Sequence, residues 1–272
     1  MSYWHGKVAI VTGASGGLGF TIAQALVSQG ARVAIAARGV EALDAAADRL
    51  RVGGGEVLAV PADVTKQADV DALVNQTVAR FGQLDLLVNN AGRSARKSVL
   101  DTTPEDFCEL LDLNFISVVR LVRACLPHLE ATAGHIANIG SLAGKSPARW
   151  IGAYPASKFA LTAYTQQLRL ELAERSGPAS QVHVLLVCPG PIARRTPREE
   201  VVSLPPGVPA SALRPGAGVK TSAIDPDWLA SKILSACEHR RLELTVPKIA
   251  RLLFVLMQIS PRLADWLIRK TT

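Results

Sequence analysis

Short apolar runs alternate with longer amphipathic segments along most of the chain. The runs Lys7–Thr12, Arg32–Arg38, Glu56–Val60 and Leu84–Val88 are rich in aliphatic residues, which is typical of strands buried on both faces of a parallel sheet. Between these runs apolar positions recur every three or four residues, as in Lys66–Phe81, and this spacing predicts helices that bury one face. Strands that alternate with helices predict an α/β domain with a doubly wound sheet.

The second half of the chain continues the alternation. A long apolar helix is predicted from Thr103 to about Leu129, then a strand over His135–Ser141, a helix from Tyr154 to about Arg175, and a strand over Gln181–Val187. From 193 to 224 the periodicity is lost and Pro, Ala, Gly and Arg dominate. A long irregular stretch in a compact domain is usually a lid or disordered, so we interpret residues 193–224 as a substrate loop.

The end of the chain predicts a helix from Asp225 to about Arg241, a strand over Leu242–Val246, and a tail, residues 247–272, that is apolar and basic. The apolar run Leu252–Met257 in this tail is far shorter than the roughly 20 residues that cross a bilayer. Three placements stay open for the tail: a helix over its own sheet or substrate cleft, a helix packed on a partner subunit, or an interfacial helix on a membrane surface.

Composition narrows the class of protein. The chain has 272 residues, 49% of them hydrophobic, which is enough for one substantial core. Its four cysteines show no CxxC or clustered spacing, and no charged and apolar leader precedes the first strand. We therefore expect reduced thiols, no metal site and a cytoplasmic protein. The net charge of +7 suits nucleic acid, a membrane surface or an anionic ligand, but dispersed basic residues and an aromatic content of 5% argue against nucleic acid.

Tyr154 and Lys158 are the strongest candidates for chemistry. They are four residues apart in a predicted helix, so their side chains share one face. A nearby ammonium favours phenolate and lowers the pKa of a phenol from about 10, which suits a group that gives a proton to a carbonyl or takes one from an alcohol. Ser141 ends a predicted strand, at the edge where open α/β sheets bind their ligands.

A glycine-rich turn, Thr12–Gly19, follows the first strand and precedes a helix. In this context glycines let the backbone approach a pyrophosphate at a helix N-terminus. Gly13, Gly17 and Gly19 are spaced four and two residues apart, whereas the dinucleotide fingerprint spaces its glycines two and three apart. The turn predicts a nucleotide site, with an ordinary turn as the alternative.

The residue that ends the second strand indicates which nucleotide binds. An NAD site usually has a carboxylate there for the ribose 2′-hydroxyl, but this strand ends in Arg38. A guanidinium favours a 2′-phosphate, so we predict NADP(H), with Arg38 and Ser15 as phosphate contacts. The alternative is that Arg38 only opens the next helix. Asp63 and Val64 follow the third strand, where they could meet an adenine edge, and Asp63 could equally cap a turn.

Polar side chains mark three further places. Asn89–Gly92 follows the fourth strand and suits close approach of the backbone to a cofactor. Asn114 lies deep inside the long helix, where a buried amide needs hydrogen-bond partners. We expect it to hold a helix kink and a water, to carry a proton path toward Lys158, or both. His183, inside a predicted strand, is expected to be a satisfied core residue.

Together these positions resemble the short-chain dehydrogenase/reductase superfamily. The motifs are TGASGGLG at 12–19, NNAG at 89–92, YPASK at 154–158 and PGPI at 189–192, with Asp63-Val64, Asn114 and Ser141 between them. The match covers the chain to about residue 246. The resemblance implies one Rossmann-fold domain, a doubly wound seven-stranded parallel sheet in the order 3-2-1-4-5-6-7 flanked by helices. It also implies homodimers or homotetramers that pair through the helices containing Asn114 and Tyr154.

The resemblance assigns a role to each site residue. Tyr154 would be the general acid/base and Ser141 would hold the substrate oxygen, while Lys158 would bind the nicotinamide ribose and lower the Tyr154 pKa. Asn114 would hold a water that links Lys158 to solvent. The predicted NADP(H) contacts are Gly13, Ser15, Gly17, Leu18, Gly19, Arg38, Asp63, Val64, Asn90, Ala91, Gly92, Tyr154, Lys158, Pro189, Gly190 and Ile192.

The chain departs from the family pattern at two places. The family usually has a threonine four residues after Gly190, where this chain has Arg194, and the next threonine is Thr196. The tail is also longer and more apolar than in many soluble members, and it resembles that of members that act on lipid-like substrates or rest on membranes. Basic residues are expected at the rim of the cleft, as solvated charge or as contacts to an anionic substrate: Arg93, Arg96, Lys97, Lys145, Arg149 and Arg194.

These observations lead to one expected function and one alternative. We expect an oxidoreductase that moves a hydride between NADP(H) and a ketone, aldehyde or secondary alcohol. The substrate is expected to be a small molecule, and a lipid-like compound is one candidate. The alternative is a nucleotide-binding regulatory or scaffold protein without turnover.

Overall fold

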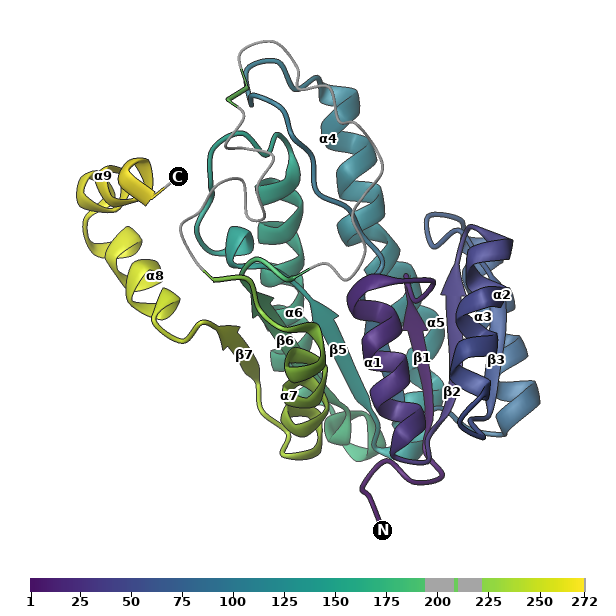
Figure 1. Cartoon of the computed structure of the whole chain (residues 1–272). Helices are drawn as coiled ribbons and strands as arrows, with labels where there is room; N and C mark the ends of the chain where they lie inside the picture. The colour runs from purple at the N-terminus through teal and green to yellow at the C-terminus, as the bar shows by residue number, and fades with distance from the viewer. Residues whose placement is uncertain (194–207, 210–221, 272) are drawn as a thin grey trace.

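Parallel strands form one sheet in the computed structural model, which describes residues 1–193, 208–209 and 222–271 (Figure 1). The sheet has seven strands in the order β3-β2-β1-β4-β5-β6-β7, which confirms the expected fold class. The strands are β1 (Val8–Thr12), β2 (Arg32–Ala37), β3 (Val57–Pro61), β4 (Leu86–Asn89), β5 (His135–Ile139), β6 (His183–Pro189) and β7 (Glu243–Val246).

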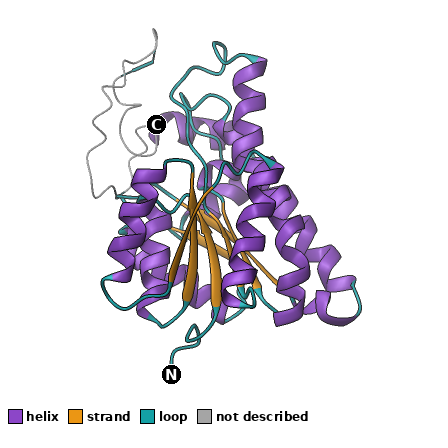
Figure 2. Cartoon of the chain, turned by 90° about the vertical axis from the view of Figure 1, so that its right-hand side faces the viewer, coloured by secondary structure: helices purple, strands orange, loops and turns teal. Residues whose placement is uncertain are grey.

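Helices cover both faces of this sheet (Figure 2). Alternate residues of β1 enter different cores: Ala9 and Val11 pack with α1, α2 and α7, whereas Val8 and Ile10 pack with α3, α5 and α6. Burial on both faces explains why the strands are continuous apolar runs. The helices are α1 (Gly17–Ser28), α2 (Val40–Arg51), α3 (Gln67–Phe81), α4 (Pro104–Leu111), α5 (Ser117–Thr132), α6 (Tyr154–Glu174), α7 (Pro226–Glu238), α8 (Ala250–Ile259) and α9 (Pro261–Thr271).

The sheet order reverses between β1 and β4. From β1 the chain proceeds outward through β2 and β3, and it then returns to place β4 on the other side of β1. Ligands of open α/β sheets bind in the crevice at the carboxyl ends of the strands beside such a switch point. The glycine turn after β1 and the segment Asn90–Gly92 after β4 therefore begin at the same crevice.

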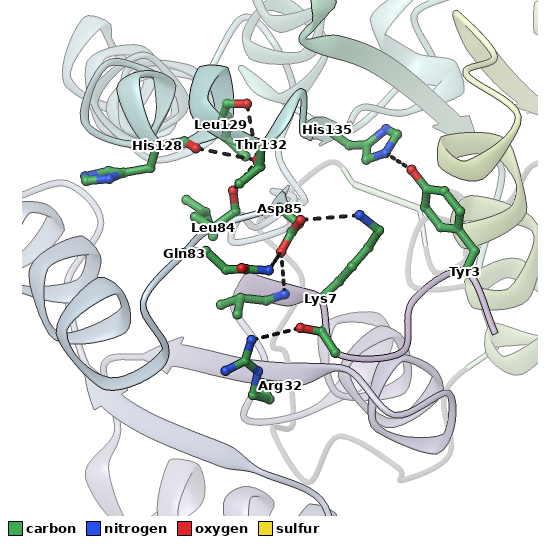
Figure 3. A network of polar contacts seen from close by, with 12 residues as sticks. Tyr3, Lys7, Arg32, Gln83, Leu84, Asp85, His128, Leu129, Thr132 and His135 are labelled. Carbon is green, nitrogen blue, oxygen red and sulfur yellow. Dashed lines mark hydrogen bonds and ion pairs between the residues drawn. The ribbon is translucent and has the colours of Figure 1, made fainter. Parts of the chain in front are cut away.

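The amino ends of the strands are joined by a polar network around Asp85 (Figure 3). Its carboxylate accepts hydrogen bonds from the Val8 backbone N–H at 2.8 Å, from Gln83 Nε2 at 2.7 Å and from Lys7 Nζ at 3.3 Å. Thr132 Oγ1 donates to the Leu84 carbonyl at 2.7 Å. These contacts hold β1, β4 and the end of α5 together at the edge opposite the crevice.

A chain of hydrogen bonds crosses the same edge through two histidines. His183 Nε2 lies 2.8 Å from the Arg241 carbonyl, which can only accept, so Nε2 carries the proton. Neutral His183 then accepts at Nδ1 from His135 Nδ1–H at 3.0 Å, and His135 Nε2 accepts from the Tyr3 hydroxyl at 2.7 Å. This network makes His183 a satisfied core residue, as the sequence predicts, and it requires both rings to be neutral.

We expect this histidine pair to destabilise the fold in acid. Burial lowers the pKa of His135 to about 3, so between pH 6.5 and pH 3 the unfolded chain binds a proton that the folded chain does not. At pH 5 the free energy of unfolding should be lower by about 2 kcal/mol from His135 alone. Urea unfolding at pH 7 and pH 5 measures this, and His135→Phe should lose less stability than the wild type. Two results would contradict the assignment. One is that His135→Phe loses as much free energy of unfolding between pH 7 and pH 5 as the wild type, and the other is that the exposed control His239→Gln loses less than the wild type.

Candidate active site

The glycine turn between β1 and α1 is shaped by close contacts that a side chain would prevent. Gly13 has a φ of +65°, and a Cβ there would lie 2.9 Å from the Ala91 Cα. At Gly19 a Cβ would lie 2.4 Å from the Gly13 carbonyl oxygen. Gly17 also has a positive φ, of +55°. The turn thus needs glycine at the three positions predicted from the sequence, and it leaves a backbone-lined space at the N-terminus of α1.

Thr12 fastens this turn to the end of β4. Its Oγ1 accepts hydrogen bonds from the backbone N–H groups of Asn90 at 3.0 Å and Ala91 at 3.1 Å, and donates to the Val88 carbonyl at 3.2 Å. Asn90 Nδ2 donates to the Thr12 carbonyl at 2.9 Å. The sequence indicated Asn90 as a cofactor contact but missed Thr12, whose place directly before Gly13 was the available signal.

Arg38 and Asp63 lie at neighbouring strand ends. Arg38 is exposed immediately after β2, and the chain after β3 is joined to β2 by the Ala62 N–H, which donates to the Ala37 carbonyl at 3.0 Å. The Asp63 carboxylate accepts from Thr65 Oγ1 at 2.7 Å and from the Thr65 N–H at 3.0 Å. The Thr65 hydroxyl, with the charge of Arg38 as a smaller contribution, lowers the Asp63 pKa. Asp63 therefore has the turn-capping role that the sequence left open.

Two other predicted contacts lie beside this pair. Ser15 is half-buried within the glycine turn, and Val64 is buried in the core under α3. The Val64 side chain is thus a packing residue.

Tyr154 and Ser141 meet where α6 begins and β5 has just ended. Both side chains line the same cavity, and the Ser141 hydroxyl lies near enough to the phenol to influence its pKa. Ser141 Oγ accepts a hydrogen bond from the Ala143 N–H at 3.1 Å. Burial raises the pKa of the Tyr154 phenol, and the nearby Ser141 hydroxyl and the charge of Arg96 only partly offset this. The prediction that Lys158 lowers the Tyr154 pKa is therefore wrong in direction, since burial outweighs the charges around the phenol.

Lys158 lies one helical turn after Tyr154, and its side chain is buried, with 6% of its surface exposed. Its Nζ donates to the Ile139 carbonyl at 2.8 Å and lies 5.9 Å from the centre of the Tyr154 ring. In the described part of the chain no carboxylate forms an ion pair with it. Burial lowers the pKa of this ammonium to about 8.

Asn114 lies in a π-helical turn, Asp112–Ile116, that separates α4 from α5. The predicted helix from Thr103 therefore continues through a π-helical turn, and the kink expected at Asn114 stays a prediction. The fully buried amide donates from Nδ2 to the Arg93 carbonyl at 3.0 Å and to Ser157 Oγ at 2.9 Å, and Oδ1 accepts from the Arg93 N–H at 3.0 Å. π-helical turns are rare and occur frequently at functional sites. The proton path through Asn114 stays a prediction.

Asn114 also fixes the close approach at Gly92. A Cβ at Gly92 would lie 2.7 Å from Asn114 Oδ1 and 3.8 Å from Lys158 Nζ. The segment after β4, the π-helical turn and α6 therefore converge on one point.

One cavity of about 380 Å³ is lined by half of the predicted site residues. It is bounded by the glycine turn at Leu18, by the segments after β4 and β6, and by the start of α6. The predicted site residues among its walls are Leu18, Asn90, Gly92, Ser141, Tyr154, Lys158, Pro189, Gly190 and Ile192.

The C-terminal tail forms another wall of this cavity. Ala250, Leu253 and Phe254 of α8 and Ile268 of α9 line it. Of the three placements left open by the sequence, covering the protein's own cleft is therefore confirmed for the inner side of these helices. The sequence did not identify these four residues as cavity walls, because an apolar tail has no motif that indicates which of its side chains make contacts.

Three of the five predicted rim residues that the structure describes are in ion pairs. Arg93 pairs with Glu109 at 2.6 Å, Lys97 pairs with Asp106, and Lys145 pairs with Glu243. Because these basic side chains are already paired with carboxylates, they argue against a binding site for an anionic substrate at the rim. Arg96, which lines the cavity, donates to the Ala95 carbonyl at 2.9 Å, and Arg149 donates to the Arg269 carbonyl at 3.4 Å.

The ends of the predicted substrate loop lie together at the crevice. Ile192 and Ile224 form a bridge, and the Ala193 N–H donates to the Ile224 carbonyl at 2.8 Å. Most of the loop, including Arg194 and Thr196, lies outside the described residues, and so does any contact that replaces the family threonine.

Comparison with known proteins identifies relatives over nearly the whole chain. A family model described as short chain dehydrogenase matches residues 7–203. The chain is 33% identical over 266 residues to an uncharacterised oxidoreductase, YxnA, of Bacillus subtilis (strain 168), covering 97% of this chain and 72% of the relative.

Solved structures with the same fold hold either nicotinamide dinucleotide. One is a short chain dehydrogenase/reductase from Burkholderia phymatum in complex with NAD, with a TM-score of 0.79, 29% identity, and coverage of 95% of this chain and 96% of that chain. Another is a metagenomic short-chain oxidoreductase in complex with NADP, with a TM-score of 0.71, 33% identity, and coverage of 89% of this chain and 97% of that chain.

Proposed function

Because the chain belongs to the short-chain dehydrogenase/reductase superfamily, we propose that it is an NADP(H)-dependent oxidoreductase that interconverts a carbonyl compound and its alcohol at Tyr154. The observation that carries the proposal is that Ser141, Tyr154 and Lys158 line the same cavity as Leu18 of the glycine turn. When bound, the nicotinamide supplies or accepts the hydride. The protein's own side chains hold the substrate oxygen and move the proton.

Tyr154 and Ser141 divide this work. A carbonyl oxygen placed between the Ser141 and Tyr154 hydroxyls would accept a hydrogen bond from both. Because burial raises the pKa of the Tyr154 phenol from its usual value, burial favours the protonated phenol, which is the state that donates to a carbonyl. Lys158 lies deeper, near Gly92 and Asn114, where its ammonium can donate to a hydroxyl of the cofactor ribose.

The residues around the glycine turn fit a dinucleotide. Gly13, Gly19 and Gly92 let segments of the protein itself pack closely around the turn, because a Cβ at each would lie less than 3 Å from a protein atom. At Gly16 and Gly17 nothing lies within 4 Å of the position of a Cβ, so a phosphate could approach the backbone there. Gly16, the residue before α1, supplies no capping side chain, so the first N–H groups of this helix face the turn. Such N–H groups favour the phosphates of a dinucleotide.

The substrate is proposed to carry its carbonyl on an apolar body. The walls opposite Tyr154 are formed by Leu142, Leu253, Phe254 and Ile268, and the nearby basic side chains are largely paired. A panel of ketones and aldehydes of increasing chain length, followed by NADPH consumption, tests the reaction class. If NADPH binds and no carbonyl of the panel is reduced, the scaffold alternative replaces this proposal.

We expect the enzyme to prefer NADPH over NADH because of Arg38. A guanidinium at the end of β2, with no carboxylate in that position, can pair with a 2′-phosphate. Arg38→Ala should lower kcat/KM for NADPH by about 10- to 100-fold, as for one or two charge-assisted hydrogen bonds, and leave the value for NADH nearly unchanged. Steady-state kinetics with both cofactors measures the ratio.

Lys66→Ala is the matched control for this measurement. It removes another exposed positive charge whose field reaches Asp63, as that of Arg38 does. The NADPH/NADH ratio should not change in this variant. A wild type that works better with NADH, or an equal loss with both cofactors in Arg38→Ala, would refute the preference.

The predicted pairing of two or four copies stays a proposal. On α6, Phe159 and Leu170 share one face and are 42% and 64% exposed, which supports association there. Light scattering on the purified chain would show a monomeric mass if this is wrong.

A further inference from the structure

We propose that the outer face of α8 and α9 binds the surface of an anionic phospholipid membrane. The two helices follow β7 at the edge of the sheet and extend from the body of the domain (yellow in Figure 1). Their inner face closes the substrate cavity, as described above. The outer face is the subject of this inference, and it does not depend on the proposed reaction.

The outer face of α8 is an apolar stripe. Leu252, Val255 and Ile259 are three and seven residues apart, so they share one side of the helix. They are 66%, 56% and 76% exposed, and the preceding Ile249 is 67% exposed. Within α8 no residue is fully buried. The inner side of α8 lines the cavity and its outer side is apolar and exposed. An exposed apolar face of this kind indicates that another apolar surface covers it.

The outer face of α9 combines apolar and basic side chains. Leu263 and Trp266 are half exposed, and Lys270 Nζ lies 4.0 Å from the Trp266 ring centre. Ala264, on the opposite side of the helix, is fully buried. An exposed tryptophan beside lysine is the arrangement found at the level of lipid headgroups, where the ring sits at the boundary and the ammonium reaches the phosphates.

Charge identifies the membrane as the occupant of this face. The tail, residues 247–272, contains one acidic residue, Asp265, and its basic residues are Lys248, Arg251, Arg262, Arg269 and Lys270. All five basic side chains are exposed. A second copy of this chain would bring the same basic tail and a net charge of +7, so pairing through this face would be repulsive. Anionic headgroups complement both the charge and the apolar stripe.

The helices are suited to lying on the surface. None of the helices within the described residues is long and apolar enough to cross a bilayer. A helix with one apolar side and a basic margin lies in the interface, with its apolar side among the acyl chains. In this orientation only one layer of helices, α8 and α9, would lie between the membrane and the cavity. An apolar carbonyl compound would therefore have a short path from the membrane to the cavity.

Co-sedimentation with vesicles tests this proposal on the full chain. We expect the protein to bind phosphatidylcholine vesicles that contain phosphatidylserine, to bind pure phosphatidylcholine much less, and to dissociate as salt is raised. The double variant Leu252→Ser/Trp266→Ser should reduce the bound fraction about tenfold or more, because it removes apolar contacts without touching the cavity walls.

The control removes the same kind of side chain elsewhere on the surface. In the double variant Val52→Ser/Leu100→Ser, residues that are 89% and 93% exposed are replaced after α2 and before α4, and vesicle binding should equal that of the wild type. Three results would overturn the proposal: no preference for phosphatidylserine, equal binding by both double variants, or a lower mass of Leu252→Ser/Trp266→Ser in light scattering. The last result would make the face a contact between subunits.

Discussion

Replacing Tyr154 by phenylalanine should lower kcat by about a hundred- to ten-thousandfold, the range that a general acid or base contributes. The variant keeps the ring that lines the cavity and removes only the phenol hydroxyl near Ser141. NADPH binding should be nearly intact, because the glycine turn, Asn90 and Lys158 are unchanged. Steady-state kinetics gives kcat, and a fluorescence titration with NADPH gives the binding constant.

Tyr164→Phe is the matched control, because it removes a phenol hydroxyl from the same helix. Tyr164 packs against Phe115 with ring centres 5.8 Å apart and does not line the cavity. Its variant should keep full turnover. If Tyr154→Phe also turned over at the wild-type rate, no proton could pass through residue 154, and the reaction assigned to this cavity would be wrong.

The fold could be read from the sequence because its strands are buried on both faces. Each strand then appears as an uninterrupted apolar run, and the observed bounds of β1, β3 and β4 differ from the predicted ones by one or two residues. The glycine positions could also be predicted, since Gly13 and Gly19 are required by contacts within one strand–turn–helix unit. Local patterns identify such units.

Features that depend on contacts between distant segments could not be predicted. Thr12 acts on the end of β4, and Asn114 connects Arg93 to Ser157, three places far apart in the sequence. The predicted lowering of the Tyr154 pKa differs from the raised pKa in the structure for the same reason. A spacing of four residues predicts a nearby charge, but Lys158 is not among the groups that shift this pKa. The burial that raises it comes from cavity walls contributed by distant parts of the fold, including α8.

Lys158→Met should stabilise the folded protein while removing turnover. At neutral pH the ammonium of Lys158 is buried without a carboxylate partner in the described structure, and burial lowers its pKa to about 8. A shift of this size from 10.5 corresponds to an upper bound of about 3 kcal/mol. Methionine has a similar length and no charge, but the Ile139 carbonyl loses its hydrogen bond, which costs about 1 kcal/mol or more. We expect a net gain of about 1–2 kcal/mol, or a few degrees in Tm.

The pH dependence separates this cause from improved packing. Below pH 8 the lysine is protonated in both the folded and the unfolded wild type, so the full cost of burying the charge is present. Between pH 8 and 10.5 the folded state releases the proton first, so the wild type gains stability with rising pH and the advantage of Lys158→Met disappears. Unfolding at pH 7 and pH 10 measures both values, with the exposed Lys66→Met as control. An advantage of Lys158→Met that is equal at both pH values, or a loss of stability at pH 7, would show that the buried charge is not what destabilises this site. A vanishing advantage would show that the protein tolerates a destabilising ammonium beside Tyr154 because the site needs it.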